Sequence, residues 1–426
     1  FSQWVSQSTG FSDTLRGIVH IWPVDENIVW ALAYDGSSND SVIQEFTKTT
    51  NGGTTWTPGV INGAAGFYPN TIFALNADTA WVTMYHPDND GGRIMRTNNG
   101  GQTWTHQSTA LYLDSLEAYP NIVYFWNANE GFSMGDPTND YFEIYTTNNG
   151  GTLWTRVDSI YLPTLISGEY GYEGEFTVIG STVFFGTSKG RVYKSNDKGH
   201  TWTAITTPLT PNGRARICEF KDTMNGIIAD RSSNVFTMYS TTNGGSTWTL
   251  LTPTGNVYGK DLCYVKGTWK TYISTGSASG VSGASISYDG GDNWIDISGI
   301  AGTKYTALGF PNNLTGWAGQ FSQSSTVGGI AKFVGNTVGL SQDAEIQDLT
   351  IYPNPSNGRF FIRLPENTSA KELVIYDCNG KMVYNENGQI LNSHFIDLSQ
   401  LSDGIYFVEM LADNEILKAK LVLLSD

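Results

Sequence analysis

The sequence predicts an all-β protein of two domains. Of its 426 residues, 48 are Gly, 13 are Trp and 22 are Tyr, and only 15% are charged. Aromatic side chains suit strands and Gly suits the tight turns between them, so this composition favours sheets over helices. A chain of this length can form two or more domains, each with its own core.

The net charge of the chain indicates which classes of binding partner to expect. The formal net charge is −16, and an acidic chain is a poor match for nucleic acid, whose binding depends on Lys and Arg neutralising phosphates. No run of 18 apolar residues occurs, so no membrane-spanning helix is expected. The weakly charged composition suits an extracellular protein. The start at Phe1 instead of Met favours a mature form that has lost a signal peptide.

A short turn motif ending in Trp recurs six times. Two examples are TNNGGQTW at 97–104 and TTNGGSTW at 241–248. The six motifs end at Trp56, Trp104, Trp154, Trp202, Trp248 and Trp294, at intervals of 48, 50, 48, 46 and 46 residues. A period of this length indicates an array of supersecondary units, and about 40–50 residues is the size of one four-stranded propeller blade.

Each position of the motif has a structural role. The third residue is Asn or Asp, which can hydrogen-bond backbone amides of the turn. These residues are Asn51, Asn99, Asn149, Asp197, Asn243 and Asp289. The Gly two residues later can adopt the positive φ that other residues resist, and the Trp packs between blades. The motifs resemble the Asp-box, or BNR, repeat S/T-x-D-x-G-x-T-W, and this resemblance implies a structural role without a part in catalysis.

The first strand of the chain is expected to complete the last blade. A second signature precedes each Trp motif, and its seventh copy at 309–317 is followed by no such motif. The missing strand is found at the N-terminus, because WVSQST at 4–9 matches WTHQST at 104–109. We therefore expect a seven-bladed β-propeller over residues 1–338, closed by the N-terminal strand, which removes open sheet edges.

The combined signatures also carry a family resemblance. The patterns F-x-N-x-x-x-G-W and T-T-x-G-G-x-T-W resemble those of photosystem II assembly factors and photosystem II stability-like proteins, over residues 1–338. They are more distantly similar to sialidases, sortilin-type receptors and xyloglucan-directed hydrolases. A sialidase should carry Arg-Ile-Pro near its start, whereas Arg16 is followed by Gly17 and Ile18, so that interpretation fails.

The pattern changes after the propeller repeats. Residues 339–347 form a polar linker, and residues 348–426 show short alternating strands that suggest a small Ig-like β-sandwich. YPNP-x-x-G at 352–358, IYD-x-x-GK at 375–381 and L-x-x-GIY at 401–406 closely resemble the type A C-terminal sorting domain of the Bacteroidetes type IX secretion system. The motif residues are Tyr352, Pro353, Asn354, Pro355, Gly358, Asp377, Gly380, Lys381, Gly404 and Tyr406.

The resemblance to a sorting domain implies a route and partners. It implies Sec export, transit through the periplasm, and contact of this domain with an outer-membrane translocon and a shuttle barrel. The protein would then be secreted or held at the outer cell surface, with the sorting domain normally cleaved. The alternative for this region is an accessory Ig-like adhesion module. Cys378 has no partner in its region, and we expect it to be a buried thiol.

Loops on one face of the propeller supply the ligand-binding candidates. The longest, 157–176, holds several Tyr and Glu residues, and aromatic platforms beside carboxylates suit sugars. The candidates are Arg16, Tyr68, Tyr170, Tyr172, Glu173, Glu175, Arg214, Arg216, Tyr258 and Lys260. No cofactor or metal site is expected, since the five His residues show no zinc-ligand spacing.

Three functions remain open at this point. The first is binding or adhesion, with a polysaccharide or a surface protein as the ligand. The second is hydrolysis of a polysaccharide, which needs two carboxylates flanking a cleft; Glu173 or Glu175 with Asp13 could supply them. The third is a scaffold for another surface protein. We favour binding.

Overall fold

The chain forms two compact units. The computed structural model describes residues 3–37, 41–88, 91–112, 119–138, 140–230, 236–337, 349–364, 369–378, 380–390, 393–412 and 415–424. One unit is Phe1–Lys266 with Tyr272–Gly335, and the other is Gly267–Thr271 with Asn336–Asp426. The expected linker at 339–347 lies outside the described residues. Within the described ranges, no helix is long and apolar enough to cross a membrane.

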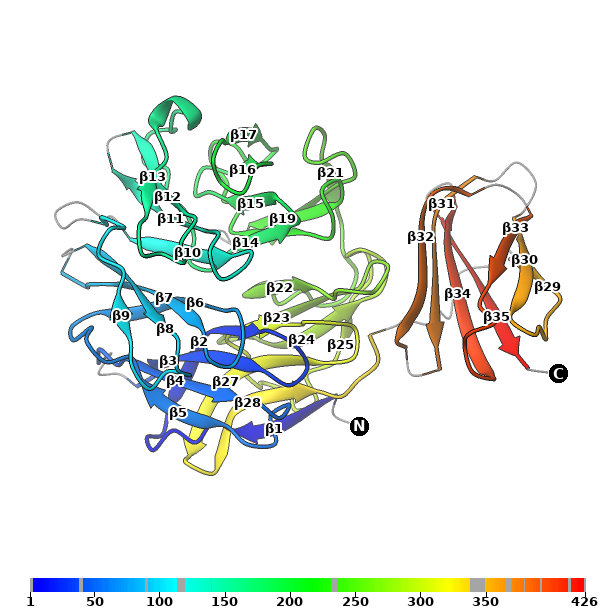
Figure 1. Cartoon of the computed structure of the whole chain (residues 1–426), viewed down its shortest axis with the longest axis horizontal. Coiled ribbons are helices and arrows are strands. Elements are labelled where there is room, and N and C mark those ends of the chain that lie inside the picture. The colour runs from blue at the N-terminus through cyan, green and yellow to red at the C-terminus, as the bar shows by residue number, and fades with distance from the viewer. Residues whose placement is uncertain are drawn as a thin grey trace. The chain divides into compact units, whose positions relative to one another are not determined.

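The first unit is built from antiparallel sheets that follow one another along the chain (Figure 1). In the described part of the chain, five of these sheets have four strands in chain order. They are β6 (Tyr68–Ala74), β7 (Ala80–Tyr85), β8 (Gly92–Thr97) and β9 (Thr105–His106); β10 (Pro120–Phe125), β11 (Gly131–Thr138), β12 (Tyr141–Thr147) and β13 (Thr155–Arg156); β14 (Phe176–Ile179), β15 (Thr182–Gly186), β16 (Arg191–Ser195) and β17 (Thr203–Thr206); β18 (Ile217–Phe220), β19 (Gly226–Asp230), β20 (Thr237–Thr241) and β21 (Thr249–Leu251); and β22 (Asp261–Tyr264), β23 (Tyr272–Ala278), β24 (Val281–Ser287) and β25 (Ile295–Asp296). A short 3-10 helix, η1 (Ser159–Tyr161), follows β13.

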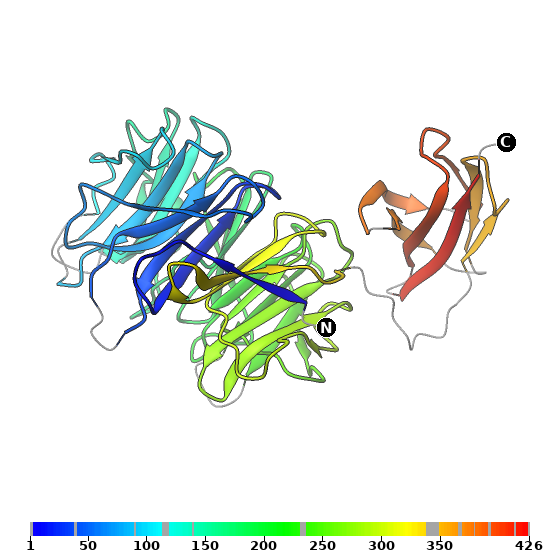
Figure 2. The ribbon, with the colours of Figure 1, turned by 90° about the horizontal axis from the view of Figure 1, so that it is seen from below.

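A larger sheet joins the two ends of this unit. Its strand order is β1–β28–β27–β2–β3–β4–β5, with β26 beside β27. The strands are β1 (Trp4–Ser8), β2 (Arg16–Pro23), β3 (Val29–Asp35), β4 (Glu45–Thr49), β5 (Thr57–Val60), β26 (Leu308–Gly309), β27 (Gly316–Ser324) and β28 (Val327–Phe333). β1 pairs with β28 in antiparallel register, starting at Trp4↔Phe333, so the dark blue strand lies beside the yellow strand in Figure 2. A single pair, Gly17↔Phe321, links β2 to β27.

Aromatic side chains fill the layers between neighbouring sheets. Trp81 of β7 stacks on Phe125 of β10 with ring centroids 3.7 Å apart. Phe184 of β15 stacks on Phe220 of β18 at 3.8 Å. All four rings are buried, and each pair joins one sheet to the next. Neighbouring sheets in this part of the chain are therefore held together by apolar burial and ring contacts.

The repeated turn motif is a hydrogen-bonded structure. In the second copy, Thr97 Oγ1 accepts a hydrogen bond from the amide of Gly101 (3.0 Å), and Asn99 Oδ1 accepts one from the amide of Thr103 (3.0 Å). Gly101 has φ +87°, a conformation that a residue with Cβ resists. In all six copies the Asn or Asp oxygen accepts the amide four residues later, at 2.8–3.0 Å.

The second unit contains two sheets over one core. The first sheet has the order β29–β30–β33 and the second β32–β31–β34–β35. The strands are β29 (Thr350–Tyr352), β30 (Arg359–Arg363), β31 (Ala370–Asp377), β32 (Met382–Ile390), β33 (His394–Asp397), β34 (Gly404–Ala412) and β35 (Glu415–Leu423). Phe360 of β30 and Leu373 of β31 are both fully buried in the shared core.

The three cysteines are free thiols. Cys218 is buried and Cys263 is partly buried, whereas Cys378 is exposed. Our expectation that Cys378 is a buried thiol is therefore wrong. The residue stands in the turn after β31, which ends at Asp377, and side chains there no longer alternate into the core.

Candidate functional site

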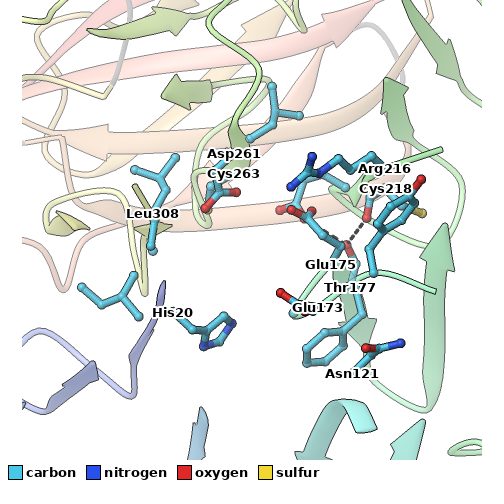
Figure 3. Close-up of a pocket in the computed structure, with 18 of the residues that line it drawn as sticks. His20, Asn121, Glu173, Glu175, Thr177, Arg216, Cys218, Asp261, Cys263 and Leu308 are labelled. Carbon is cyan, nitrogen blue, oxygen red and sulfur yellow. Dashed lines mark hydrogen bonds between the residues drawn. The ribbon is translucent and has the colours of Figure 1, made fainter. Parts of the chain in front are cut away.

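The first strands of several sheets line one cavity. Its volume is about 630 Å³, and its walls come from β2, β6, β10, β14, β18, β22 and β26 together with the loop before β14. Of these strands, β6, β10, β14, β18 and β22 are each the first strand of a four-stranded sheet, whereas β2 and β26 belong to the larger sheet. The repeat therefore gathers residues that are distant in sequence around a single space, and Figure 3 shows a close-up of it.

The segment 170–175 reaches into the cavity from the long loop before β14. Its base is anchored by Glu169, whose buried carboxylate forms an ion pair with Arg191 and accepts a hydrogen bond from Thr187 Oγ1 at 2.6 Å. Because a buried charge is stable only when it is paired and hydrogen-bonded, this anchor fixes the loop. The same loop presents two carboxylates to the cavity.

Glycine is required where this segment passes the opposite wall. Gly174 has φ +68°, and a Cβ on it would lie 2.7 Å from Cδ2 of His20 in β2. Its amide donates a hydrogen bond to the carbonyl of Asn121 in β10 (3.0 Å). The backbone of 170–175 is thus held against β2 and β10, which sets the positions of the carboxylates on either side of Gly174.

The carboxyl groups of Glu175, Glu219 and Asp261 line the side of the cavity formed by β14, β18 and β22, and Figure 3 labels Glu175 and Asp261. Glu219 of β18 accepts hydrogen bonds from the amide of Tyr264 (2.9 Å) and from Thr177 Oγ1 (3.0 Å). Burial raises the pKa of Glu219 to about 7, although these hydrogen bonds oppose the shift. Burial also raises the pKa of Glu175 and Asp261, and the carboxylate of Asp261 further raises the pKa of both Glu175 and Glu219.

Basic side chains line the same cavity. Arg214, Arg216 and Lys260 line it and are exposed to solvent. The guanidinium of Arg216 lies 5.9 Å from the ring centroid of Tyr172, within range of a cation–π contact. Glu173 is open to the water of the cavity, yet the surrounding protein still raises its pKa by desolvation, with Lys260 and Arg216 opposing.

The imidazole of His20 is neutral near pH 7. Burial lowers the pKa of His20 to about 4, because the surrounding protein disfavours the charged ring. Its Nδ1 accepts a hydrogen bond from the amide of Ile72 at 3.4 Å. The ring therefore contributes a polar but uncharged wall opposite the carboxyl groups.

Several buried polar atoms of the cavity wall have no hydrogen-bond partner. Within the described residues, Asn70 Oδ1, Tyr172 Oη and Thr306 Oγ1 are enclosed and unpaired. Beside them, the exposed ring of Tyr170 lies 5.7 Å from that of Tyr172 at an interplanar angle of 71°. An unpaired polar atom removed from water is destabilising, and since these three atoms are covered by protein, a ligand in the cavity would not contact them unless the wall rearranged.

The structure brings together most of the predicted ligand-binding residues. Those that line the cavity are Tyr170, Tyr172, Glu173, Glu175, Arg214, Arg216 and Lys260. The other three do not line it. Arg16 forms ion pairs with Asp13 (2.6 Å) and Glu45 (2.8 Å), and Tyr258 donates its hydroxyl to Asp296. Asp13 does not line the cavity either, so it does not supply there the second carboxylate that hydrolysis with Glu173 or Glu175 would need.

Tyr68 does not line the cavity but packs against a residue that does. Its ring stacks on Tyr85 with centroids 5.5 Å apart, and Tyr85 is the residue that lines the cavity.

Sequence reasoning also missed His20, Glu219 and Asp261. The available signal was a single polar residue inside each otherwise apolar strand, as in ICEF at 217–220.

The fold and the repeats define the chain as a BNR-type β-propeller with a C-terminal sorting domain. Residues 88–319, more than half of the chain, match the family model of the photosynthesis system II assembly factor YCF48, and the chain belongs to that family. Residues 350–424 match the secretion system C-terminal sorting domain. The predicted resemblance and route are thus confirmed: the protein is exported by type IX secretion to the cell surface or the medium.

Several solved structures share the fold. A structure of YCF48 bound to D1 peptide has a TM-score of 0.56 and 16% identity, and the match covers 79% of this chain and 98% of that one. YCF48 from Cyanidioschyzon merolae gives 0.54 and 15%, over 78% and 98%. The GH74 xyloglucanase from Xanthomonas campestris gives 0.53 and 10%, over 84% and 59%. At these identities the likeness concerns the fold alone. No curated protein sequence matches the chain.

Proposed function

We propose that this type IX cargo is a binding protein whose cavity captures a hydroxyl-rich glycan. The observation that carries the proposal is the lining of the cavity, where the rings of Tyr170 and Tyr172 lie beside the basic side chains of Arg214, Arg216 and Lys260. Sugar hydroxyls both donate and accept hydrogen bonds, so a glycan can bond to these charged groups while its ring packs on an aromatic face.

The aromatic side of the cavity supports the same ligand class. Tyr170 is 39% exposed although its loop is firmly anchored through Glu169 and Arg191. A rigid, exposed ring offers a flat apolar face, and the C–H face of a sugar ring packs well on such a surface. Tyr170 would stack on the sugar.

We further propose that the sheets close into a ring of seven blades. The seventh blade would contain β26, β27, β28 and the N-terminal strand β1. The pairing of β1 with β28 supports this arrangement, and so does the Gly17↔Phe321 pair that links the last strands to β2. A closed ring would give the cavity a continuous wall.

A segment of another surface protein is the second candidate ligand. The exposed side chains of Arg214, Arg216 and Lys260 stand beside the carboxyl groups of the cavity, and a polypeptide carries both charge signs. A solved structure of YCF48 is bound to a D1 peptide, and this supports a peptide as a ligand for a propeller of the same fold. A protein ligand would also give the chain the role of a scaffold.

Hydrolysis of a polysaccharide is the weaker alternative. A glycosidase needs one carboxyl group that holds a proton and a second that is ionised. Burial raises the pKa of Glu175, Glu219 and Asp261, and Asp13, the second carboxylate that the sequence suggested for hydrolysis, does not line the cavity. The arrangement therefore favours binding.

Capture of glycans by the full-length protein tests this proposal. We would screen a glycan array and then measure retention on the best polymer for wild type, Tyr170→Ala and Tyr172→Phe. Loss of the stacking ring should weaken retention by about fivefold. Tyr172→Phe should leave retention unchanged and stability unchanged or higher, because the lost hydroxyl is enclosed by protein and has no partner in the described structure.

Tyr161→Ala is the matched control, since Tyr161 is half exposed in the same loop but does not line the cavity. It should bind like wild type. Release of reducing sugar that a single Glu175→Gln change abolishes would replace binding with hydrolysis. Retention of an acidic or basic protein segment, without any glycan signal, would select the second candidate ligand.

A further inference from the structure

An aromatic ladder crosses the three-stranded sheet of the second unit. Tyr352 of β29, Phe361 of β30 and Phe395 of β33 are neighbours across the strands, with ring centroids 5.7 Å and 5.2 Å apart. Their exposed fractions are 42%, 39% and 51%. We call these three residues the ladder. A contiguous exposed apolar patch of this kind marks an interaction site more often than a lone exposed residue does.

The ladder faces outward because side chains alternate along each strand. In β30, Phe360 and Ile362 are fully buried, and Phe361 between them points to the other face. Ile351 and Ile396 supply the core from the flanking strands in the same way. The core of this unit is therefore formed by the opposite face of the sheet, and the ladder is not part of it.

Basic residues flank the ladder on the same outward face. Arg359 and Arg363 lie two positions before and after Phe361 and are exposed. Arg359 pairs with Asp397 at 3.0 Å, whereas Arg363 forms no ion pair with any residue in the described ranges. The face thus has an apolar centre with the Arg359–Asp397 ion pair on one side and the cation of Arg363 on the other, on a chain whose formal net charge is −16.

We propose that the ladder is the surface through which the sorting domain docks on a protein of the type IX export machinery. The partner surface would be apolar at its centre and acidic at its rim. All three ladder residues fall within 350–424, the part of the chain that matches the sorting domain. Aromatic and Arg side chains are the residues enriched in the centres of protein–protein interfaces.

Charge argues against a second copy of the same face as the occupant. In a symmetric dimer the same face would be presented twice, and its carboxylate Asp397 is already paired with Arg359, which leaves Arg363 without an acidic partner there. An acidic partner pairs with Arg363 instead. The proposal is independent of the propeller cavity, so it stands or falls without the proposed glycan ligand.

Delivery of the full-length protein in a bacterium with a type IX system tests the ladder. We would compare wild type with Phe361→Thr/Phe395→Thr, because Thr suits strands but lacks the ring. The ratio of protein at the surface or in the medium to protein in the periplasm should fall about tenfold, the effect of losing a hot-spot aromatic. A photoreactive amino acid in place of Phe361, in the otherwise unchanged chain, should cross-link the protein to a component of the export machinery.

Ile405→Thr is the matched control, since Ile405 is 41% exposed on β34 of the other sheet. It should be delivered like wild type. If the double variant unfolds, Arg363→Glu provides the second test and should also reduce delivery, because it repels an acidic rim without touching the core. Normal delivery of a folded ladder variant would overturn the proposal, as would a ladder-dependent dimer or glycan complex with unchanged delivery.

Discussion

Glu219 shows how one residue can make the stability of the fold depend on pH. Its carboxyl group keeps its proton up to about pH 7 in the folded protein, because burial raises its pKa from the ordinary value of 4.5. The unfolded chain loses that proton near pH 4.5. The stability that protonated Glu219 contributes is therefore fully present below pH 4.5 and is lost as the pH rises through 7.

Glu219→Gln should remove this dependence. The amide can still bond to Tyr264 and Thr177 but carries no charge, so we expect wild-type stability at pH 4 and about 2 kcal/mol more than wild type at pH 8. Urea unfolding followed by Trp fluorescence measures both values. Glu130→Gln is the control: Glu130 is exposed and paired with Lys198, and its pKa is lowered, so this change should not stabilise the protein at pH 8. Equal gains for both variants would contradict the assignment.

At the residue scale the sequence could predict loop positions better than strand positions. Tyr172 and Glu175 were found because a long Tyr- and Glu-rich loop must lie at one face of a propeller. Glu219 and Asp261 were not found, since the face to which a strand residue points depends on pairing register, and a one-residue shift reverses it. Arg16, which we expected at the ligand-binding face, does not line the cavity and instead forms ion pairs with Asp13 and Glu45.

The Trp turn motif is the element that the sequence predicted in most detail. Its geometry depends on residues within eight positions, so the required Gly and Asn can be identified without tertiary information. In the copy at 97–104, Asn99 Oδ1 accepts the Thr103 amide and Asn99 Nδ2 donates to Thr103 Oγ1 at 2.8 Å. Cys378 illustrates the opposite case, because its exposure depends on where β31 ends.

Asn99→Ala should destabilise the first unit by about 1 kcal/mol, the usual net contribution of a side-chain-to-backbone hydrogen bond in a turn. Asn98→Ala is the control for the loss of the Asn99 hydrogen bond. Asn98 is exposed, adjacent in the same turn and makes no hydrogen bond to the described residues through its side chain, so this change should have no measurable effect. Chemical unfolding of the two variants compares them directly. Similar losses would show that chain entropy of the turn, and not the Asn99 bond, is responsible.

At the scale of the whole molecule, the period of 46–50 residues was enough to predict stacked four-stranded sheets, whereas ring closure depends on contacts between chain ends. The strand β1 makes the contacts on which our proposal of a closed ring depends. Trp4 packs against Tyr305 and Phe333, with ring centroids 5.3 Å and 5.1 Å away, in the last group of strands. Gln7 Oε1 accepts the indole N–H of Trp56 at 3.0 Å, in the turn between β4 and β5.

Deleting residues 1–9 should therefore destabilise the first unit by about 4 kcal/mol, because it removes a buried indole and a five-residue ladder. The deletion also leaves β28 with an unpaired edge, which favours aggregation. Trp4→Ala should account for most of the loss, whereas Val5→Ala, at a half-exposed position of the same strand, should have little effect. A synthetic peptide of residues 1–12, added in excess, should restore much of the melting temperature, since the strand would again pair with β28. An unchanged melting temperature in the deletion variant would show that β1 is an appendage, and the proposal of a ring closed by the N-terminus would then fail.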